Sequence, residues 1–531
     1  MCFPYMLLHT DLEITMKGYQ LLETCETERL QFVQRMAYDV SKCHVTHVCG
    51  SISSSVVLAI WMPPSPSSTS LPRLITQATL MMSLPHIQRG IREKKVSLVR
   101  FELSDYYGIS HCKAIPARHF EEKVENGLPF YFGHLGFDPQ AAIVPGTGYS
   151  EETSFGDAIF HSDLTTFRKV PWAKNTARVL TVPKCDGKLV AGYPRTILQR
   201  LLGELRGIGY SLLSCHEHEF FVFDAKTKKP VIDGRQIRST IRLAKNEDFV
   251  LQIADQLPEM GVDVESIETE YAPGEYEITY KPAFGVAAAD NAFTYKNGIK
   301  EIAQKHSLLA TFMTKPFPDQ VAASAHLNHS LWDVDCEKSL MHDAEEPHGL
   351  SKAARHWMAG ILYHAPAITV LMSQTVNCLK RLEAHIFAPG NATWAIDNRT
   401  TALRVKLNGE KGVYIENRMG SAAGCPYISL AATVAAGMDG LKNQYELPPP
   451  VDGIAYDDLT ELPPKTMPLP VDMESALEKL VNDEVIREAF GADFIKCFTA
   501  LKMYEVKLEA EAKANGVDAS EWAFGYYSEY M

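Results

Sequence analysis

Six carboxylate and imidazole side chains lie in four short segments, and the spacing of the first two strongly restricts the local fold. Glu217 and Glu219 stand two residues apart. Side chains alternate between the faces of a β-strand, so this spacing places both carboxylates on one face. Phe220 and Phe221 indicate a partly buried position, where two unpaired charges would be costly. A bound cation removes this conflict; a solvated strand face with charged ends is the alternative.

The second acidic segment contains a predicted turn. Pro273-Gly274 separates Glu270 from Glu277, so the chain can reverse and both carboxylates can face one cavity. Glu268 and Glu275 are then expected to face solvent. A purely structural acidic turn is the alternative.

The remaining two candidate ligands are a histidine and a glutamate. His326 follows the small residues 322–325, which allow a ligand to approach the backbone closely. A hydrogen-bonded core histidine is the alternative. Glu416 stands two residues before Arg418, which predicts an acid and a base on one strand face.

Four arginines follow within a short part of the chain and are interleaved with apolar residues. Arginine binds phosphate and carboxylate groups through paired hydrogen bonds, although surface ion pairs would give the same pattern. Carboxylates with one imidazole are typical ligands of hard divalent cations. Together the two sets favour phosphoryl transfer from a nucleotide. The arginines are Arg381, Arg399, Arg404 and Arg418.

Composition argues against several other classes of protein. The chain has 531 residues, is 46% hydrophobic and carries a net charge of -13, which does not favour a nucleic-acid-binding face. Eleven scattered cysteines without a Cys-x-x-Cys pair argue for a reducing compartment. The apolar run 56–62 is too short to span a membrane. The first residues lack the basic region of a signal peptide, so the cytosol is expected.

Hydrophobic periodicity divides the chain into three parts. Residues 1–90 contain Ser- and Pro-rich stretches and are predicted to be a disordered extension. Residues 94–186 read as a small β-rich domain, and residues 190–531 as a larger second domain. Strands are expected at 96–103, 177–182 and 310–313, and helices at 195–205, 288–303, 353–372 and 474–514. The aromatic tail 522–527 is expected to dock on the body.

These motifs, in this order, resemble the glutamine synthetase superfamily from about residue 95 onward. Besides the six candidate ligands, the resemblance rests on the segments 315–317, 377–382 and 394–399. It implies an α+β fold, with an N-terminal β-grasp domain followed by a catalytic domain built on a curved antiparallel sheet or half-barrel. Within the superfamily, segments 101–116, 330–335 and 416–421 resemble the lengsin branch. Vertebrate lengsins are regarded as catalytically silent and lack several metal glutamates, all of which are present here.

The resemblance also implies roles for individual residues. Two Mg²⁺ or Mn²⁺ ions would lie between the β-grasp domain of one subunit and the catalytic sheet of a neighbour in a large homo-oligomer, a dodecamer in the family. One ion would be held by Glu219, Glu270 and Glu277, and the other by Glu217, His326 and Glu416. Arg399, Arg404 and Glu416 would be catalytic, Arg381, Arg399 and Arg418 would bind substrate, and Ser330 and Arg404 would contact ATP.

The implied reaction is ATP-dependent ligation of glutamate, or a similar acid, to ammonia or an amine through a γ-glutamyl phosphate. Several positions depart from the ammonia-using members. Phe387 replaces a glutamate that binds ammonium, Val321-Ala322 replaces the Asn-Gly that holds glutamate, and Asn328 replaces a second histidine. A non-catalytic, structural or chaperone-like oligomer and an ATP-binding metabolite sensor remain as alternatives.

Overall fold

The first sheet of the molecule is built from the segment predicted to be β-rich. The computed structural model describes residues 84–382, 387–410, 412–456 and 459–531. Six strands pair in the order β2-β1-β5-β4-β3, with β6 beside β5, and only β1 and β5 run parallel. Helix α4 (Phe120–Asn126) connects β2 to β3. Whether this sheet is a β-grasp domain stays a prediction. The strands are β1 (Leu98–Ser104), β2 (Ser110–Pro116), β3 (Leu128–Tyr131), β4 (Asp157–Lys169), β5 (Thr176–Cys185) and β6 (Lys188–Leu189).

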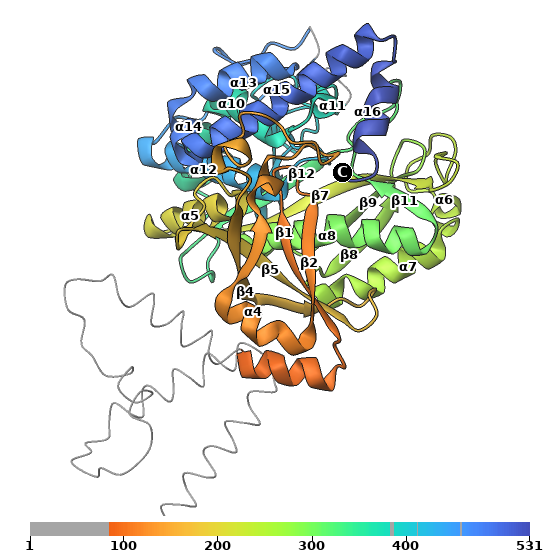
Figure 1. Ribbon diagram of the computed structural model, residues 1–531. Helices are drawn as coiled ribbons and strands as arrows, with labels where there is room; N and C mark the ends of the chain where they lie inside the picture. Colours follow the sequence, from red (N-terminus) through yellow and green to blue (C-terminus); the bar gives the residue numbers. More distant parts are fainter. Residues whose placement is uncertain (1–83, 383–386, 411, 457–458) are drawn as a thin grey trace, which may run out of the picture. The chain divides into compact units, whose positions relative to one another are not determined.

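The second sheet has nine strands and a central long strand, β7 (Ser211–Asp224). Its main path is β13-β14-β15-β12-β7-β9-β8, while β10 and β11 also pair with β7. The sheet curls as a half-barrel with helices around it (Figure 1). The other strands are β8 (Val264–Thr269), β9 (Glu275–Tyr280), β10 (Ala283–Phe284), β11 (Leu308–Thr311), β12 (Ala325–Trp332), β13 (Trp394–Ile396), β14 (Leu403–Leu407) and β15 (Val413–Asn417).

Helices cover this sheet and form much of the hydrophobic core. The long helix α8 packs against β7 and β11, and the almost wholly buried α12 packs against α5, α9 and α10. Figure 1 shows α8 running beside the strands in green. The helices are α5 (Pro194–Gly207), α6 (Thr240–Ala244), α7 (Glu247–Gln256), α8 (Val286–Lys305), α9 (Lys352–Tyr363), α10 (Ala365–Met372), α11 (Val376–Leu379), α12 (Pro426–Asn443), α13 (Met473–Asn482), α14 (Glu484–Phe490), α15 (Ala492–Ala514) and α16 (Ala519–Tyr527).

Two predicted helices are interrupted. The expected helix 353–372 is divided into α9 and α10, because Pro366 lacks an amide hydrogen and starts the second helix. The expected one or two helices over 474–514 are three. Asp483 caps α14 by accepting a hydrogen bond from the Ile486 amide at 3.0 Å. Gly491, with φ of 82°, turns the chain between α14 and α15.

Most other expected elements occur, with shifted ends. The predicted strand 310–313 is β11, which begins and ends two residues earlier. The aromatic tail docks as predicted, since Tyr527 donates a hydrogen bond to Glu505 and Tyr526 donates one to Asp138. Residues 84–93 are helical, so ordered structure begins inside the predicted extension. The rest of that extension, residues 1–83, lies outside the described residues. None of the described helices is long and apolar enough to cross a membrane.

Candidate active site

A cavity of about 910 Å³ opens beside the central strands and contains nearly all of the candidate residues. Strands β7, β9, β12 and β15 supply its inner part, which we call the floor. Loops at 235–238 and 318–322, together with Tyr271 and Phe387, supply its outer part, which we call the mouth. The floor contains the six candidate metal ligands and the mouth contains several apolar side chains. The candidate residues lining the cavity are Glu217, Glu219, Glu270, Glu277, His326, Arg381, Arg399, Arg404, Glu416 and Arg418.

Strand register brings three of the candidate ligands together on the floor. Glu217 on β7 lies opposite His326 on β12, and β15 places Glu416 on the other side of β12. His326 Nδ1 lies 3.5 Å from a Glu217 oxygen and 3.3 Å from a Glu416 oxygen. One ligand atom of each residue falls within 4.8 Å of the others. Their arrangement matches the predicted second ion site, although the residue roles stay a proposal.

The other predicted ion site lies further along the sheet, where the three carboxylates within ligand distance of one another are Glu268, Glu270 and Glu277 rather than the predicted Glu219, Glu270 and Glu277. Glu219 on β7 pairs with Glu277 on β9, and Glu270 lies in the turn before β9. Burial and the neighbouring Glu217 raise the pKa of Glu277 to about 11, and burial with the Glu219 charge raises that of Glu270 to about 7. Glu219 Oε2 accepts a hydrogen bond from the Ser324 amide at 2.5 Å. Carboxylates that repel one another in this way are stabilised by a cation.

The expectation that Glu275 faces solvent is wrong, whereas Glu268 is half-buried. Glu275 is only 1% exposed and lines the cavity; one of its oxygens accepts a hydrogen bond from the Ala272 amide at 2.9 Å. Residues two apart on a strand share a face, so β9 carries Glu275 on the same face as Glu277. Glu268 is half-buried, groups with Glu270 and Glu277, and is paired with Arg238. Strand alternation, which is visible in the sequence, would have predicted the inward position of Glu275.

The floor fits hard divalent cations by two observations. Its donors are carboxylate oxygens and one imidazole, the set that suits Mg²⁺ or Mn²⁺. His326 Nδ1 is buried and has no hydrogen-bond partner among the described residues, although it lies between two carboxylates. Burial and the nearby Arg418 charge hold the pKa of His326 well below its usual range, so the imidazole is neutral and able to bind metal.

Three of the four arginines are tied to the floor. Arg404 Nη1 donates to Glu416 Oε2 at 2.9 Å, and Arg418 Nη1 donates to the other Glu416 oxygen. Arg381 is 4% exposed, and its Nη2 lies 3.4 Å from His326 Nε2. Burial lowers the pKa of Arg381 to about 10, which still leaves it charged at neutral pH. Arg399 is exposed and lines the cavity, so it differs from the other three.

A second cavity of about 430 Å³ meets the first at Glu217, which lines both. Ser330, the predicted ATP contact, lines this second cavity rather than the first. Its hydroxyl accepts a hydrogen bond from the Trp332 indole at 2.9 Å. Asn328, the departure noted in the sequence, donates to Glu217 Oε2 at 2.9 Å and therefore positions a candidate ligand. Two openings thus reach one carboxylate from different directions.

The two histidines of β7 lie apart from the six candidate ligands, although His216 lines the second cavity. His216 and His218 are buried outside the larger cavity, as the strand alternation predicts, and their rings stack with centroids 5.3 Å apart. Sequence reasoning also missed Arg235, Ile237 and Tyr271, which line the mouth. No sequence motif distinguished these loop residues, and only the folded position of the loops reveals them.

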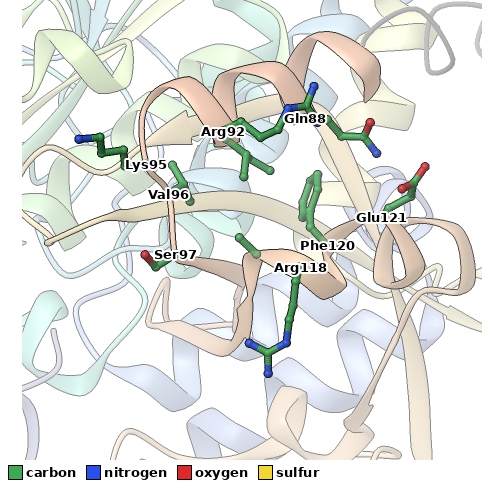
Figure 2. Close-up of a pocket in the computed structure, with 10 residues that line it drawn as sticks. Gln88, Arg92, Lys95, Val96, Ser97, Arg118, Phe120 and Glu121 are labelled. Atoms are coloured by element: carbon green, nitrogen blue, oxygen red, sulfur yellow. The ribbon is translucent and has the colours of Figure 1, made fainter.

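A third hollow, of about 490 Å³, lies between residues 88–97 and 117–121. It carries the basic residues Arg92, Lys95 and Arg118. Figure 2 shows that their charged ends point away from one another, with the Arg118 guanidinium directed opposite to that of Arg92. The basic groups therefore do not converge on one ligand, and this hollow is no second candidate site.

Comparison with known proteins places the chain and its fold in one family. Residues 191–520 match the profile described as "Glutamine synthetase, catalytic domain". Human lengsin is 35% identical over 456 residues, covering 82% of this chain and 85% of lengsin. A Thermotoga maritima glutamine synthetase is 31% identical, covering 78% and 94%. A Pseudomonas sp glutamate–isopropylamine ligase is 27% identical, covering 78% and 93%.

Solved structures also match the fold of this chain. The structure titled "Crystal structure of novel glutamine synthase homolog" has a TM-score of 0.71 and 26% identity, covering 81% of this chain and 98% of that chain. A GmaS complex with ADP has a TM-score of 0.72 at 24% identity, covering 82% and 98%, which supports the fold alone. Ligases among the relatives support ligase activity in general, while the similarity to lengsin leaves the non-catalytic alternative open. The chain belongs to the glutamine synthetase family.

Proposed function

We propose that the protein is an ATP-dependent ligase that joins glutamate, or a similar acid, to ammonia or an amine. The observation that carries the proposal is the position of Glu217. It groups with His326 and Glu416 in one cavity and also lines the second cavity, where Ser330 lies. A nucleotide entering from the Ser330 side and an amino acid entering from the other would therefore meet at the same carboxylate.

Two divalent ions, Mg²⁺ or Mn²⁺, are part of the proposal. Glu217, His326 and Glu416 would hold one, and Glu219, Glu270 and Glu277 the other. When bound, such ions neutralise phosphoryl charge and hold phosphate oxygens in place. Burial, together with repulsion from neighbouring carboxylates, raises the pKa values of Glu270 and Glu277, and bound cations would relieve that repulsion, which supports this assignment.

The proposed first step makes an acyl phosphate. A γ-carboxylate oxygen of glutamate attacks the γ-phosphorus of ATP, the bond to the β,γ-bridging oxygen breaks, and ADP leaves with that bond's electrons. Arg404, beside the floor carboxylates, and the exposed Arg399 would offset charge on the transferring phosphoryl group. Arg404 already contacts Glu416 at 2.9 Å, so it is held next to the proposed ion ligands.

Glutamate binding is assigned to Arg381, with Arg418 and Arg399 nearby. The Arg381 guanidinium is buried on the floor beside His326 and is held by the Arg418 carbonyl at 3.1 Å. A buried, charged guanidinium held by a neutral carbonyl favours an anionic ligand. Val321-Ala322 lines the same cavity where relatives carry Asn-Gly, so a related acid in place of glutamate is included in the proposal.

The second step transfers the acyl group to nitrogen. The amine nitrogen bonds to the γ-carbon, the bond from that carbon to the phosphate oxygen breaks, and inorganic phosphate leaves. Phe387, where ammonia-using members carry a glutamate, lines the cavity and favours an acceptor other than ammonium. A cytosolic location and a large homo-oligomer complete the proposal. Light scattering tests the oligomer, and a monomer would contradict a site shared between subunits.

A non-catalytic, lengsin-like oligomer is the second candidate. The 35% identity to lengsins over most of the chain favours it. The two candidate functions differ in the role of the floor. A structural protein would not require six convergent metal-ligand-type side chains, whereas the ligase would.

Phosphate release from ATP, with Mg²⁺, glutamate and each of a set of amines, tests the proposal. We expect release that depends on both glutamate and an acceptor and that is lost in Glu217→Ala. No release with any acceptor, together with no thermal stabilisation by ATP and Mg²⁺, would favour the structural candidate instead.

A further inference from the structure

We infer that Asp397 is a positioning residue of the candidate active site, which pairs with Arg404 and thereby leaves Glu416 free to bind a metal ion. Asp397 would serve the proposed ligase function, on which this inference rests, although it lines neither the larger nor the second cavity. It directly follows β13, and Arg404 lies on the neighbouring strand β14. Its carboxylate therefore acts on the site through another side chain.

The Arg404 guanidinium is divided between two carboxylates. Its Nη1 donates to Glu416 Oε2 at 2.9 Å. Its Nε donates to Asp397 Oδ1 at 3.0 Å, and its Nη2 donates to the same oxygen. The Asp397 side chain is 59% exposed and that of Glu416 only 4% exposed. A solvent-facing carboxylate and a buried one thus compete for one arginine.

Glu416 is a proposed ion ligand, yet guanidinium groups hold both of its oxygens. Arg418 Nη1 donates to Oε1, and Arg404 Nη1 donates to Oε2. A guanidinium and a metal ion compete for the same carboxylate oxygen, and their positive charges repel each other. Ion binding is therefore favoured when one of the two arginines can exchange Glu416 for another carboxylate.

Arg404, rather than Arg418, has such an alternative partner. The two other nitrogens of Arg418 donate to neutral carbonyls, Nε to that of Arg399 at 3.1 Å and Nη2 to that of Phe387 at 3.0 Å. The two other nitrogens of Arg404 both donate to a carboxylate. On leaving Glu416, Arg404 would keep charge-assisted hydrogen bonds, whereas Arg418 would keep only neutral acceptors. Arg404 is therefore the arginine that can exchange its partner.

Backbone and side-chain contacts hold Asp397 in place for this exchange. Its amide donates to the Val405 carbonyl at 3.0 Å, which joins it to β14 beside Arg404. Its φ of 50° lies in the left-handed region, which aspartate and asparagine adopt more readily than most residues. Lys406 Nζ also donates to Asp397 Oδ1, at 2.7 Å. The hydrogen bonds from Lys406 and Arg404 lower the pKa of Asp397 to about 2, so its carboxylate is charged at neutral pH.

The exchange would also direct the charge of Arg404. With an ion on Glu416, the pair with Asp397 would keep the guanidinium at the larger cavity, which Arg404 lines. Its positive charge would then be available to the transferring phosphoryl group rather than to the buried carboxylate. Asp397 adds no covalent step to the reaction, because it changes only where one charge is held.

Mn²⁺ binding to the full-length protein, measured by isothermal titration calorimetry, tests this role. Asp397→Asn keeps the size of the side chain and suits the left-handed backbone, but it removes the charge. We expect it to raise the Mn²⁺ dissociation constant about tenfold, as changes to residues that support metal ligands do. Glu410→Gln removes a charge of the same sign from the exposed turn after β14 and should leave the constant unchanged.

A second background shows whether Asp397 acts through Arg404. Arg404→Ala removes the competing guanidinium from Glu416, so Asp397→Asn should no longer change the Mn²⁺ dissociation constant when Arg404 is already replaced. The same change in both backgrounds, or an equal change in Glu410→Gln, would overturn the inference. Wild-type binding that Asp397→Asn leaves unchanged overturns it while leaving the ligase function standing. No Mn²⁺ binding by the wild type, with or without ATP, contradicts both.

Steady-state kinetics give a further readout. At saturating Mg²⁺, we expect Asp397→Asn to lower kcat for phosphate release about tenfold and to leave KM for glutamate unchanged, because Arg381 rather than Arg404 is assigned to the amino acid. A raised KM for glutamate with an unchanged kcat would overturn the link between Asp397 and Arg404.

Discussion

The floor and the mouth of the cavity differ in what holds them in place. Floor residues stand mainly on β7, β9, β12 and β15, where backbone hydrogen bonds fix which side chains face one another. Mouth residues stand on loops that are tied together by a few contacts between side chains and backbone. The difference suggests that one sheet can keep its phosphoryl chemistry while loop changes alter the amine it accepts.

The largest expected effect lies on the floor. Glu217→Ala removes the carboxylate that both cavities share, and Glu217→Gln keeps its shape without its charge. We expect both to lower kcat by at least about 10³-fold, because phosphoryl transfer is accelerated mainly by stabilising the charge on the transferring group. Phosphate release measures kcat, and unchanged circular dichroism excludes misfolding. A loss below tenfold would place the chemistry elsewhere.

Metal binding should stabilise the protein against unfolding, and only the floor carboxylates should be needed for this stabilisation. Mn²⁺ at about 100 times its dissociation constant adds about 2.7 kcal/mol to the free energy of unfolding. We expect Glu277→Gln to reduce this stabilisation, because it removes one proposed ligand, and EDTA to abolish it. Glu259→Gln, on an exposed 3₁₀ helix, serves as the control. Thermal unfolding with and without Mn²⁺ measures the effect, and equal shifts in both variants would contradict the ligand assignment.

A change at the mouth should redirect the enzyme without disabling it. Phe387→Glu places a carboxylate where ammonia-using relatives carry one and keeps the backbone carbonyl that Arg418 binds. We expect kcat/KM for ammonium to rise about tenfold and that for larger primary amines to fall by a similar factor. The maximal rate of phosphate release should change much less. A large loss of rate with every acceptor would mean that Phe387 is needed for the phosphoryl chemistry at the floor rather than for the choice of acceptor.

The smallest expected effect concerns His364, which belongs to neither the floor nor the mouth and therefore serves as a comparison for both. Burial would lower the pKa of His364, but Asp483 at 2.6 Å and Asp439 at 3.1 Å outweigh it and raise the pKa. A raised folded pKa stabilises the fold below the unfolded value near 6.5, and this stability is lost as pH rises through the folded value.

The stability difference between wild type and His364→Asn should therefore be larger at pH 6 than at pH 9. We expect the difference in Tm to shrink by about 2 °C, with the activity profile unchanged. Differential scanning fluorimetry measures it. A gap that grows with pH would show that the histidine is neutral in the fold.

The sequence predicted the local parts of this account better than its long-range parts. Two-residue spacing placed Glu217 and Glu219 on one face without reference to the fold. The meeting of Glu217 with His326 and Glu416 depends on the register of three strands far apart in the chain. Residue patterns alone do not specify such a register, and the family resemblance supplied it.

The errors have equally specific causes. Glu275 was expected to face solvent once Glu270 and Glu277 were assigned to the cavity, yet strand alternation and the Ala272 amide turn it inward. The helix break near Pro366 was not predicted from the sequence, because apolar residues continue on both sides of it. The mouth could not be predicted, since Ile237 and Tyr271 meet only after the loop folds back onto Thr269.

In the proposed reaction, an oxygen of the glutamate γ-carboxylate attacks ATP at the floor. Glutamate labelled with ¹⁸O in that carboxylate, incubated with ATP, Mg²⁺ and an accepted amine, tests it by mass spectrometry of the released phosphate. We expect one labelled oxygen in each phosphate, because the acyl phosphate breaks between carbon and oxygen. Phosphate without the label would show that water attacks ATP and would contradict the account.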